Sequence, residues 1–132
     1  MQRITLALYT LTCVFFITAC QTVEQMPDYD GSALYQGYCA SCHGAGGAGD
    51  GPVAGSMTVV LQDLRGIKQR NGGVFPRQQV AEAIDGRSMR AAHGTADMPV
   101  WGWEFGQVEE SDAHTQARID ALVSYLEGIQ RN

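Results

Sequence analysis

Apolar side chains repeat at helical spacing near the end of the chain, from Ser111 onward. They fall at positions i, i+3, i+4 and i+7 and so form a single stripe: Ile119, Leu122, Val123 and Leu126. The Ser111 hydroxyl is placed to cap such a helix, and Asp112 favours its first turn through the helix dipole. The pattern predicts an amphipathic helix with one buried face.

A second helical pattern covers residues 31–43. Leu34 and Tyr38 are four residues apart, as are Tyr35 and Cys39, so each pair shares a helix face. The pattern predicts a helix that includes both cysteines of the segment.

Shorter helices are predicted in the middle of the chain. Pro76 suits the first position of a helix because it lacks a donor that would be unpaired there. Val80 and Ile84 then share a face before Gly86 ends the helix. Residues 57–71 indicate a further short helix that ends before the glycine pair that follows them.

Two stretches are predicted to be irregular. Residues 44–55 contain six glycines and Pro52, a composition that excludes regular structure and predicts a loop. Residues 87–106 also lack a period, with Met98 and Pro99 near their centre. Because no segment alternates as a strand does, the expected fold class is all-α.

Composition and charge narrow the class of protein. The chain has 132 residues, 45% of them hydrophobic and 17% charged, which fits one globular domain. Nine basic residues against fourteen acidic ones give a net charge of -5, so no nucleic-acid partner is expected.

The first residues have the pattern of an export signal. Met1 and Arg3 provide a positive end, and the apolar stretch that follows is too short to span a bilayer comfortably. It ends in Ile17-Thr18-Ala19-Cys20, which resembles the bacterial lipobox, where the cysteine is lipidated and becomes the new N-terminus. The alternative is an ordinary or uncleaved signal in which Cys20 is incidental.

These observations predict three segments. Residues 1–19 are the expected signal peptide, residues 20–30 a lipidated tether, and residues 31–132 the folded domain. The tether is polar, contains Pro27 and lacks an apolar period. The expected location is therefore an exported, periplasm-facing lipoprotein anchored in a membrane, with a soluble periplasmic protein or an uncleaved anchor as the alternatives.

The chemistry is concentrated in Cys39-Ala40-Ser41-Cys42-His43, which has the Cys-x-x-Cys-His spacing of c-type haem attachment. On a helix, residues i, i+3 and i+4 share a face, so Cys39 and Cys42 can reach two vinyl groups of one porphyrin while His43 points towards its iron. The motif predicts one covalently bound haem c, with His43 as an axial ligand.

Other uses of this motif explain less of the sequence. A thioredoxin-like redox pair would need a strand-helix-strand context, and structural zinc would need four ligands, with only His93 and His114 as further histidines. A plain disulfide between Cys39 and Cys42 stays open, but it leaves His43 and the glycines without a role.

The chain resembles the class I cytochromes c over nearly all of residues 31–131. The resemblance rests on the haem motif, the glycine loop to Pro52 and two groups of helix residues: Gly31, Tyr35 and Cys39, then Leu122, Tyr125 and Leu126. It implies that the first and last helices cross and that shorter helices surround the haem. It also implies that the Pro52 carbonyl accepts the Nδ1 proton of His43.

Met98 is the expected sixth ligand of the haem iron. It begins Met98-Pro99-Val100-Trp101-Gly102, which resembles the methionine ligand loop of that family. The competitors are Met57 and Met89, which are expected to be packing or surface residues, and His93, which has no motif around it. An open or otherwise liganded site is the remaining alternative.

Ligation by His43 and Met98 would leave no open iron position, and it would favour a raised potential. The expected function is therefore single-electron transfer between redox proteins, which are predicted to be membrane-associated, with no catalytic residues and no small-molecule substrate. A haem subunit of a larger oxidoreductase fits the same features. The alternative function is a small haem enzyme or a gas or redox sensor with a labile sixth ligand.

Supporting roles are predicted for side chains that can donate hydrogen bonds. Trp101, Trp103, Arg65 and Arg70 are candidates for binding the haem propionates, although core packing explains the aromatic residues equally well. Glu109 belongs to an acidic run that is expected to be a solvated approach to the last helix.

The charges are unevenly distributed along the chain. Six of the eight basic residues that follow the predicted signal peptide precede residue 91: Arg65, Lys68, Arg70, Arg77, Arg87 and Arg90. Residues 97–127 hold seven acids against Arg118. This asymmetry either orients docking to a charged partner or reflects solvated faces.

Overall fold

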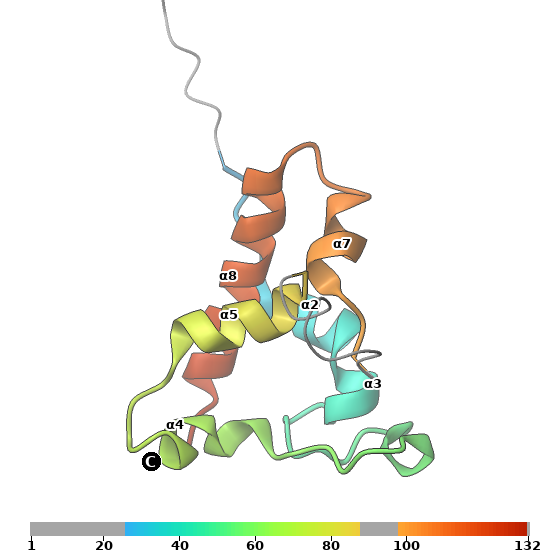
Figure 1. The fold of residues 1–132 in the computed structure, drawn as a ribbon, viewed down its shortest axis with the longest axis vertical. Helices are drawn as coiled ribbons and strands as arrows, with labels where there is room; N and C mark the ends of the chain where they lie inside the picture. Colours follow the sequence, from blue (N-terminus) through green and yellow to red (C-terminus); the bar gives the residue numbers. More distant parts are fainter. Residues whose placement is uncertain (1–25, 88–97, 132) are drawn as a thin grey trace, which may run out of the picture.

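The computed structural model of the chain describes residues 26–87 and 98–131, and all regular structure in these ranges is helical. The elements are α2 (Gly31–Tyr38), α3 (Ala40–His43), η1 (Ala54–Ser56), η2 (Leu64–Gly66), α4 (Ile67–Arg70), α5 (Arg77–Asp85), α7 (Trp101–Gly106) and α8 (Asp112–Gly128) (Figure 1). This arrangement confirms the predicted all-α class. The predicted signal peptide with Cys20, and also Met89 and His93, lie outside the described residues.

Helix α8 is the longest helix of the described residues, and α2, α5 and α7 all pack against it (Figure 1). The side-chain oxygen of Ser111 caps α8 by accepting a hydrogen bond from the backbone N–H of His114 at 3.2 Å. The predicted apolar stripe of α8 is buried, with its members no more than 5% exposed: Ile119, Leu122, Val123 and Leu126. The predicted last helix and its buried face are therefore confirmed.

The first and last helices meet closely at Gly31. A Cβ atom at this position would overlap the backbone carbonyl of Ala121 on α8, so only glycine permits the observed approach. The aromatic rings of Tyr35 and Tyr125 pack beside it, with their centroids 4.9 Å apart. This contact holds the start and middle of α2, the helix that leads into the Cys39–His43 segment, against α8.

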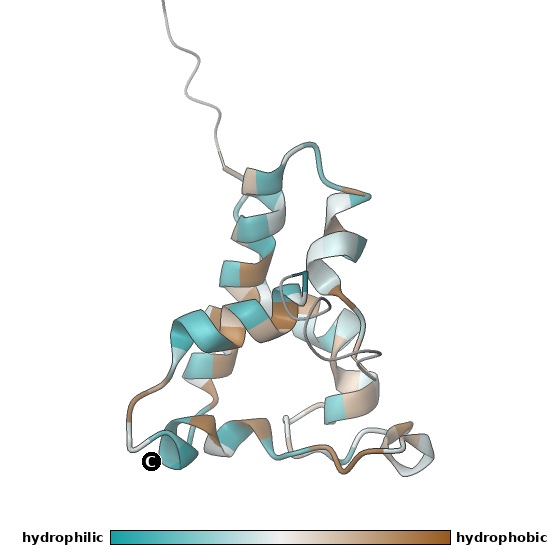
Figure 2. Cartoon of the chain, viewed as in Figure 1, coloured by the Kyte–Doolittle hydropathy of each residue, from teal (hydrophilic) through white to brown (hydrophobic). Residues whose placement is uncertain are grey.

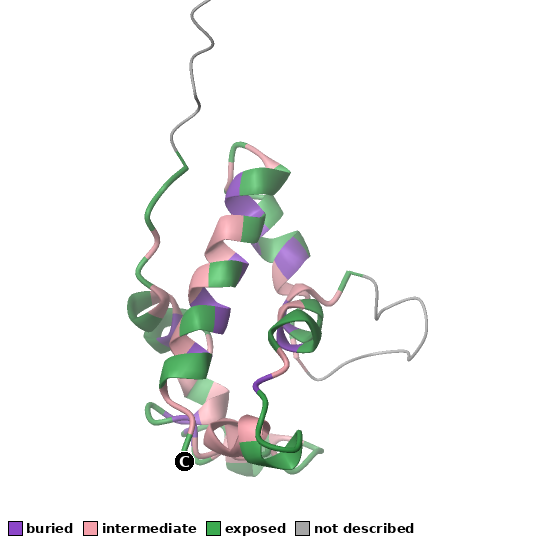
Figure 3. Ribbon diagram, turned by 90° about the vertical axis from the view of Figure 1, so that its left-hand side faces the viewer, coloured by how far each residue is buried: buried purple, intermediate pink, exposed green. Residues whose placement is uncertain are grey.

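The hydrophobic core lies between α8 and the three helices that pack on it. Its buried side chains include Tyr35 of α2, Val80 and Ile84 of α5 and Phe105 of α7. Figure 3 shows that the buried residues of α8 face these helices while its other side is exposed. One shared core holds α2, α5 and α7 in place around the site described below.

The predicted helix over residues 31–43 is interrupted at Cys39. Helix α2 ends at Tyr38 and α3 begins at Ala40, because Cys39 has φ -114° and ψ -34° and so leaves the regular helical path. Helical hydrogen bonding continues through the break, since the backbone N–H of His43 donates to the Cys39 carbonyl at 2.9 Å. The turn that carries the motif is therefore helical although the helix is not continuous.

The middle of the chain differs in detail from the prediction. Residues 57–63 form no helix, and regular structure resumes only with η2 and α4. Pro76 occupies the N-cap position of α5, so the helix begins at Arg77, one residue after the predicted start, and Gly86 ends it with a left-handed φ of 68°. The glycine loop over residues 44–53 lacks regular structure as predicted, but η1 occupies Ala54–Ser56 within the predicted loop.

The prediction that residues 87–106 are irregular is wrong for α7. Trp101 and Phe105 are one helical turn apart and their rings stack at 5.4 Å, which stabilises a helix despite Gly102 and Gly106. In residues 26–87 and 98–131, no helix combines the length and apolar character needed to cross a membrane.

Candidate functional site

The candidate site is built around the turn that carries Cys39, Cys42 and His43. Both cysteines are partly buried and neither forms a disulfide, so the plain disulfide considered from sequence is not formed. Within the described residues, no three histidine, cysteine or acidic side chains are grouped to hold a metal ion, which removes support for a zinc site. The two thiols and the imidazole are therefore left for another group.

The glycine loop folds back on this turn and fixes it from behind. The backbone N–H of Gly49 donates to the His43 carbonyl at 2.8 Å, and that of Gly51 donates to the Cys42 carbonyl at 3.2 Å. A Cβ atom on Gly51 would overlap the carbonyl oxygens of Ser41 and Cys42. Gly51, and Gly49 against the Leu61 carbonyl, are thus needed for close backbone approach, whereas Gly46 and Gly55 meet no atom within 4 Å.

Two cavities open in front of the turn, with volumes of about 430 and 420 Å³. Cys39, His43 and Met98 line both of them, so the two cavities are parts of one space around these three residues. Volumes of this size are typical of sites that hold small molecules or cofactors. The elements around this space are α2, α3, the segment before η2, η2 itself, α4, α5, α7 and α8 (Figure 1).

The first cavity is lined almost entirely by apolar and sulfur-containing side chains. Besides the shared residues, its walls are formed by Tyr38, Cys42, Met57, Val59, Leu61, Pro99 and Trp101. No Asp, Glu, Lys or Arg lies in this wall. This side suits the hydrocarbon edge of a flat cofactor.

The second cavity has a different wall, because both core residues and polar side chains line it, and the polar side chains lie at its opening. Leu64, Val80, Ile84 and others provide an apolar floor, and the polar residues are Gln62, Arg70, Asn71 and Gln79. Amide and guanidinium groups donate hydrogen bonds to carboxylates. This side therefore suits the charged edge of a cofactor that carries carboxylate groups.

His43 has a buried ring nitrogen without a hydrogen-bond partner, at Nδ1. The expected hydrogen bond from this nitrogen to the Pro52 carbonyl is not formed, and Pro52 is exposed, so that prediction is not met in this structure. Burial lowers the pKa of His43, which favours the neutral imidazole that metals bind.

These features fit haem c. The site offers two thiols not engaged in a disulfide, a neutral imidazole, and a space with one apolar and one polar side. A thioether-linked porphyrin with an axial histidine and two propionates needs such a set of groups. No residue within the two cavities carries a negative charge that would oppose the propionates.

The structure separates the predicted sixth-ligand candidates. Met98 is partly buried, packs against the core and lines both cavities, as His43 does. Met57 lines only the apolar cavity, a position that sequence reasoning had treated as packing or surface. Among the described residues, Met57 and Met98 thus face the site, and only Met98 shares both cavities with His43.

The four predicted propionate partners fall into two groups. Arg70 lines the polar cavity and Trp101 the apolar one. Arg65 lines neither cavity, because its guanidinium forms a two-pronged pair with Asp63 at 2.8 Å. Trp103 is exposed and also lies away from both. Sequence reasoning missed Asn71 and Gln79, whose amides no motif distinguishes from surface residues.

Glu109 is not part of a solvated acidic run, contrary to the sequence prediction. It pairs with Arg118, and the two side chains are only 9% and 16% exposed. The Tyr29 hydroxyl donates a second hydrogen bond to Glu109 at 2.6 Å, and the Arg118 guanidinium lies over the Tyr29 ring. This cluster joins the segment before α2 to the start of α8.

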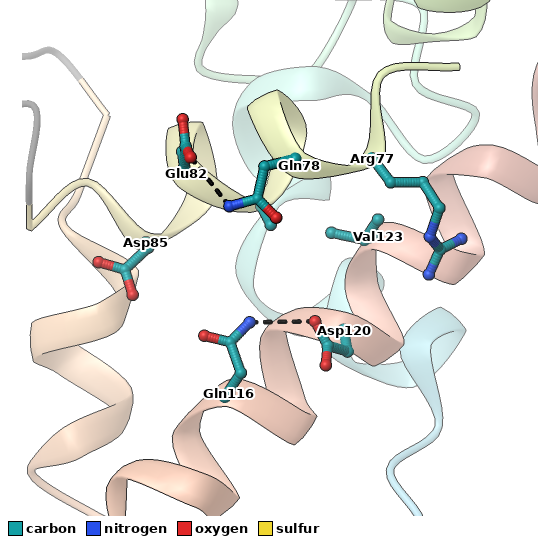
Figure 4. A pocket seen from close by; sticks show the side chains of 8 residues that line it. Arg77, Gln78, Glu82, Asp85, Gln116, Asp120 and Val123 are labelled. Atoms are coloured by element: carbon teal, nitrogen blue, oxygen red, sulfur yellow. Dashed lines mark hydrogen bonds between the residues drawn. The ribbon is translucent and has the colours of Figure 1, made fainter. Parts of the chain in front are cut away.

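A separate polar groove of about 300 Å³ lies between α5 and α8 and shares no residue with the two cavities (Figure 4). Its carboxylates already have partners on the same helix or nearby. Glu82 accepts from Gln78 at 2.9 Å, Asp120 accepts from Gln116 at 3.0 Å, and Asp85 pairs with Arg87 (Figure 4 shows the first two). The groove is therefore a surface between two helices whose carboxylates are already hydrogen-bonded or paired.

Comparison with known proteins gives one match. The family described as Cytochrome c matches the chain over residues 29–130, a range that includes the haem motif, the glycine loop, Met98 and all eight described elements. No curated protein and no solved structure matches it significantly. The chain belongs to the cytochrome c family, whose fold it has, and it is a haem-binding electron-transfer protein with covalently bound haem c.

Proposed function

We propose that this protein carries single electrons through a haem whose thioether bonds are made by Cys39 and Cys42 and whose iron is bound by His43 and Met98. The observation that supports this assignment is the position of Cys39, His43 and Met98, which line both halves of one space. One cofactor placed there would contact all three residues at once.

The ligand set determines the kind of chemistry. Histidine and methionine together complete the iron coordination, so no position is left for a substrate or for oxygen. The soft thioether of Met98 favours the reduced iron and raises the potential. The low pKa of His43 keeps its imidazole neutral, and the apolar walls around both ligands limit water access.

The two sides of the space orient the cofactor. We infer that the propionates lie towards Arg70, Asn71 and Gln79, because these are donors at the polar opening. The hydrocarbon edge then lies towards the apolar wall with Val59 and Trp101. In this arrangement Trp101 packs against the hydrocarbon edge of the haem. Arg65 binds no propionate and instead stabilises the fold by pairing with Asp63.

The proposed cellular setting is the periplasmic side of a membrane, with Cys20 lipidated after removal of residues 1–19. This setting rests on the sequence alone. The tether of residues 20–30 would be attached to the domain at its end, where Tyr29 donates a hydrogen bond to Glu109 near the start of α8. The partners would be redox proteins of the membrane or periplasm, which donate and accept the electron.

The ligand assignment is tested by a matched pair of variants, Met98→Ala and Met57→Ala. Both methionines line the apolar cavity, and the two substitutions remove the same side-chain atoms. The variants should therefore differ only in whether the lost sulfur was bound to the iron. We expect Met98→Ala to abolish the sulfur-to-iron charge-transfer band of the oxidised holoprotein and to lower its potential. Met57→Ala should leave the band in place.

The opposite result would assign the sixth ligand to Met57. A band that survives in both variants, or a wild-type holoprotein without the band, would exclude methionine ligation at Met98. The second of these outcomes would favour the alternative function, a small haem enzyme or sensor with an open iron position.

A further inference from the structure

The end of α5 meets the start of α7 at Gly102. Helix α5 ends at Asp85, and α7 begins at Trp101, three residues after Met98. Gly102 is buried, and a Cβ atom there would lie 2.7 Å from Nε of Arg87 and from Oδ1 of Asp85. Figure 4 shows the Asp85 carboxylate beside the ribbon of α7. The missing side chain of Gly102 therefore lets the Arg87–Asp85 pair lie directly on the backbone of α7.

Arg87 binds Asp85 through both its backbone and its guanidinium. The backbone N–H and Nε of Arg87 donate to Oδ1 of Asp85 at 3.0 and 2.9 Å, and Nη2 donates to Oδ2 at 2.8 Å. The remaining guanidinium nitrogen, Nη1, donates to Asp112 at the start of α8 at 3.0 Å. The hydrogen bonds from the Arg87 side chain lower the pKa of Asp85, so its carboxylate is charged at neutral pH. One guanidinium therefore joins the end of α5 to the starts of α7 and α8.

A second contact between α5 and α7 involves Gly86 and Val100. Gly86 ends α5 with a φ of 68°, and a Cβ atom there would lie 3.4 Å from Cα and Cγ2 of Val100. Val100 is the N-cap of α7, and its carbonyl accepts backbone hydrogen bonds from Trp103 and Glu104 at 2.9 and 3.0 Å. The end of α5 thus contacts α7 both at its cap and in its first turn.

These two contacts fix the chain just beyond Met98. Val100 and Gly102 are two and four residues after Met98, and Pro99, which directly follows Met98, has a restricted backbone φ. Met98 itself lines both cavities and packs against the core. A displacement of α7 at Gly102 would therefore reach the sulfur of Met98 through a short and restricted segment.

We propose that Arg87 is a positioning residue for the bond between iron and Met98: paired with Asp85 on top of Gly102, it holds the start of α7 where the sulfur can reach the iron. This inference rests on the proposed function, since it takes Met98 as the sixth ligand. Loss of the pair would let α7 shift and would raise the fraction of molecules whose iron is open. A small ligand that competes with Met98 binds only this fraction, so its apparent affinity reports the change.

The chain offers a matched control for each part of this contact. Figure 2 shows hydrophilic positions along α5 from its start, where Arg77 pairs with Glu127 of α8. Both side chains of this pair are more exposed than Asp85, at 48% and 44% against 18%, and neither lines a cofactor cavity. Gly106 lies on α7 as Gly102 does, but a Cβ atom at Gly106 would meet nothing closer than 3.9 Å.

The test titrates the oxidised holoprotein with imidazole and follows the loss of the sulfur-to-iron band. Arg87→Gln removes the charge of the pair, and Gly102→Ala displaces the pair without removing a charge. Both variants should raise the apparent affinity for imidazole by about tenfold or more, because the iron is open in a larger fraction of molecules. The controls Arg77→Gln and Gly106→Ala should change this affinity by less than about twofold.

Urea unfolding of the same proteins separates positioning from stability alone. A lower free energy of unfolding in Arg87→Gln and Gly102→Ala, with imidazole bound as in wild type, would overturn the positioning role. Equal gains in imidazole affinity in these variants and in the two controls would overturn it as well.

Arg87→Lys gives a graded version of the test. Lysine keeps the charge but lacks the planar fork that reaches both Asp85 and Asp112, so its imidazole affinity should lie between those of wild type and Arg87→Gln. Where Arg87→Gln does not fold, Arg87→Lys and Gly102→Ala decide the question by the same comparison. A wild-type holoprotein without the sulfur-to-iron band would refute ligation by Met98 and this inference with it. A wild type that has the band, with variants that bind imidazole as it does, would refute only the role of Arg87.

Discussion

The hydroxyl of Tyr35 donates a hydrogen bond to the backbone carbonyl of Gly44, 2.8 Å away, inside the protein. Tyr35 lies on α2 and Gly44 directly follows His43, so this bond connects the first helix to the end of the haem-binding turn. Both residues are buried. The bond thus holds the base of the cofactor site in place.

Replacing Tyr35 by Phe should destabilise the holoprotein by about 1–3 kcal/mol, because the buried Gly44 carbonyl loses its donor. Urea unfolding followed by circular dichroism measures this change. A variant as stable as wild type would show that water replaces the hydroxyl at this carbonyl.

The same side chain predicts a loss of stability at alkaline pH. Burial raises the pKa of Tyr35 from 10.0 to about 12. The native state therefore holds the phenolic proton more tightly than the unfolded state does, so the stability from this group is complete below pH 10 and is lost as pH rises towards 12. The Tyr35→Phe variant should lose less unfolding free energy than wild type over this pH range, because it has no phenolic proton at this position. Unfolding free energies of both proteins from pH 9 to 12 test it, and parallel curves would contradict the assignment.

The close contact between α2 and α8 predicts opposite effects of two glycine substitutions on one helix. Gly31→Ala should destabilise the protein by about 1–3 kcal/mol, because the new methyl group meets the backbone of Ala121. Gly37→Ala should stabilise it by about 0.5–1 kcal/mol, since no atom lies within 4 Å of a Cβ there and alanine favours the helix. Thermal unfolding of the pair tests this. A stabilising Gly31→Ala would mean that the helices can separate without cost.

The buried pair of Glu109 and Arg118 should matter more for stability than an exposed pair on the same helix. Glu109→Gln leaves the Arg118 guanidinium without its counter-charge in a site that is 16% exposed, and we expect a loss of about 3 kcal/mol. Glu127→Gln breaks the exposed pair with Arg77 and should cost less than about 1 kcal/mol. Equal effects of the two variants in urea unfolding would contradict the role given to Glu109.

Much of the fold was predictable because it follows from local patterns. The stripe in α8 and its Ser111 cap depend on spacing within one helix, and the motif at Cys39 depends on five consecutive residues. Pattern rules describe such short-range features well. The same applies to the glycine loop, whose backbone must approach the haem-binding turn.

Features that depend on distant residues were not predictable. Helix α7 contains two glycines and forms because Trp101 and Phe105 stack and pack together with Tyr38 of α2. Glu109 looks like one member of an acidic run until Arg118 and Tyr29 are brought to it by the fold. Arg65 and Arg70 are alike in the sequence, but in the fold Arg65 pairs with the Asp63 carboxylate, whereas Arg70 donates to the Asp63 backbone carbonyl and lines the cavity.

The central claim, an electron carrier with both iron positions filled by the protein, is tested most directly by adding carbon monoxide to the reduced holoprotein and recording its absorption spectrum. We predict a low-spin spectrum that does not change, because in the proposed ligation His43 and Met98 would fill both iron positions. A spectrum that shifts readily to that of a carbonyl complex would contradict the account, since it would show an iron position open to small molecules.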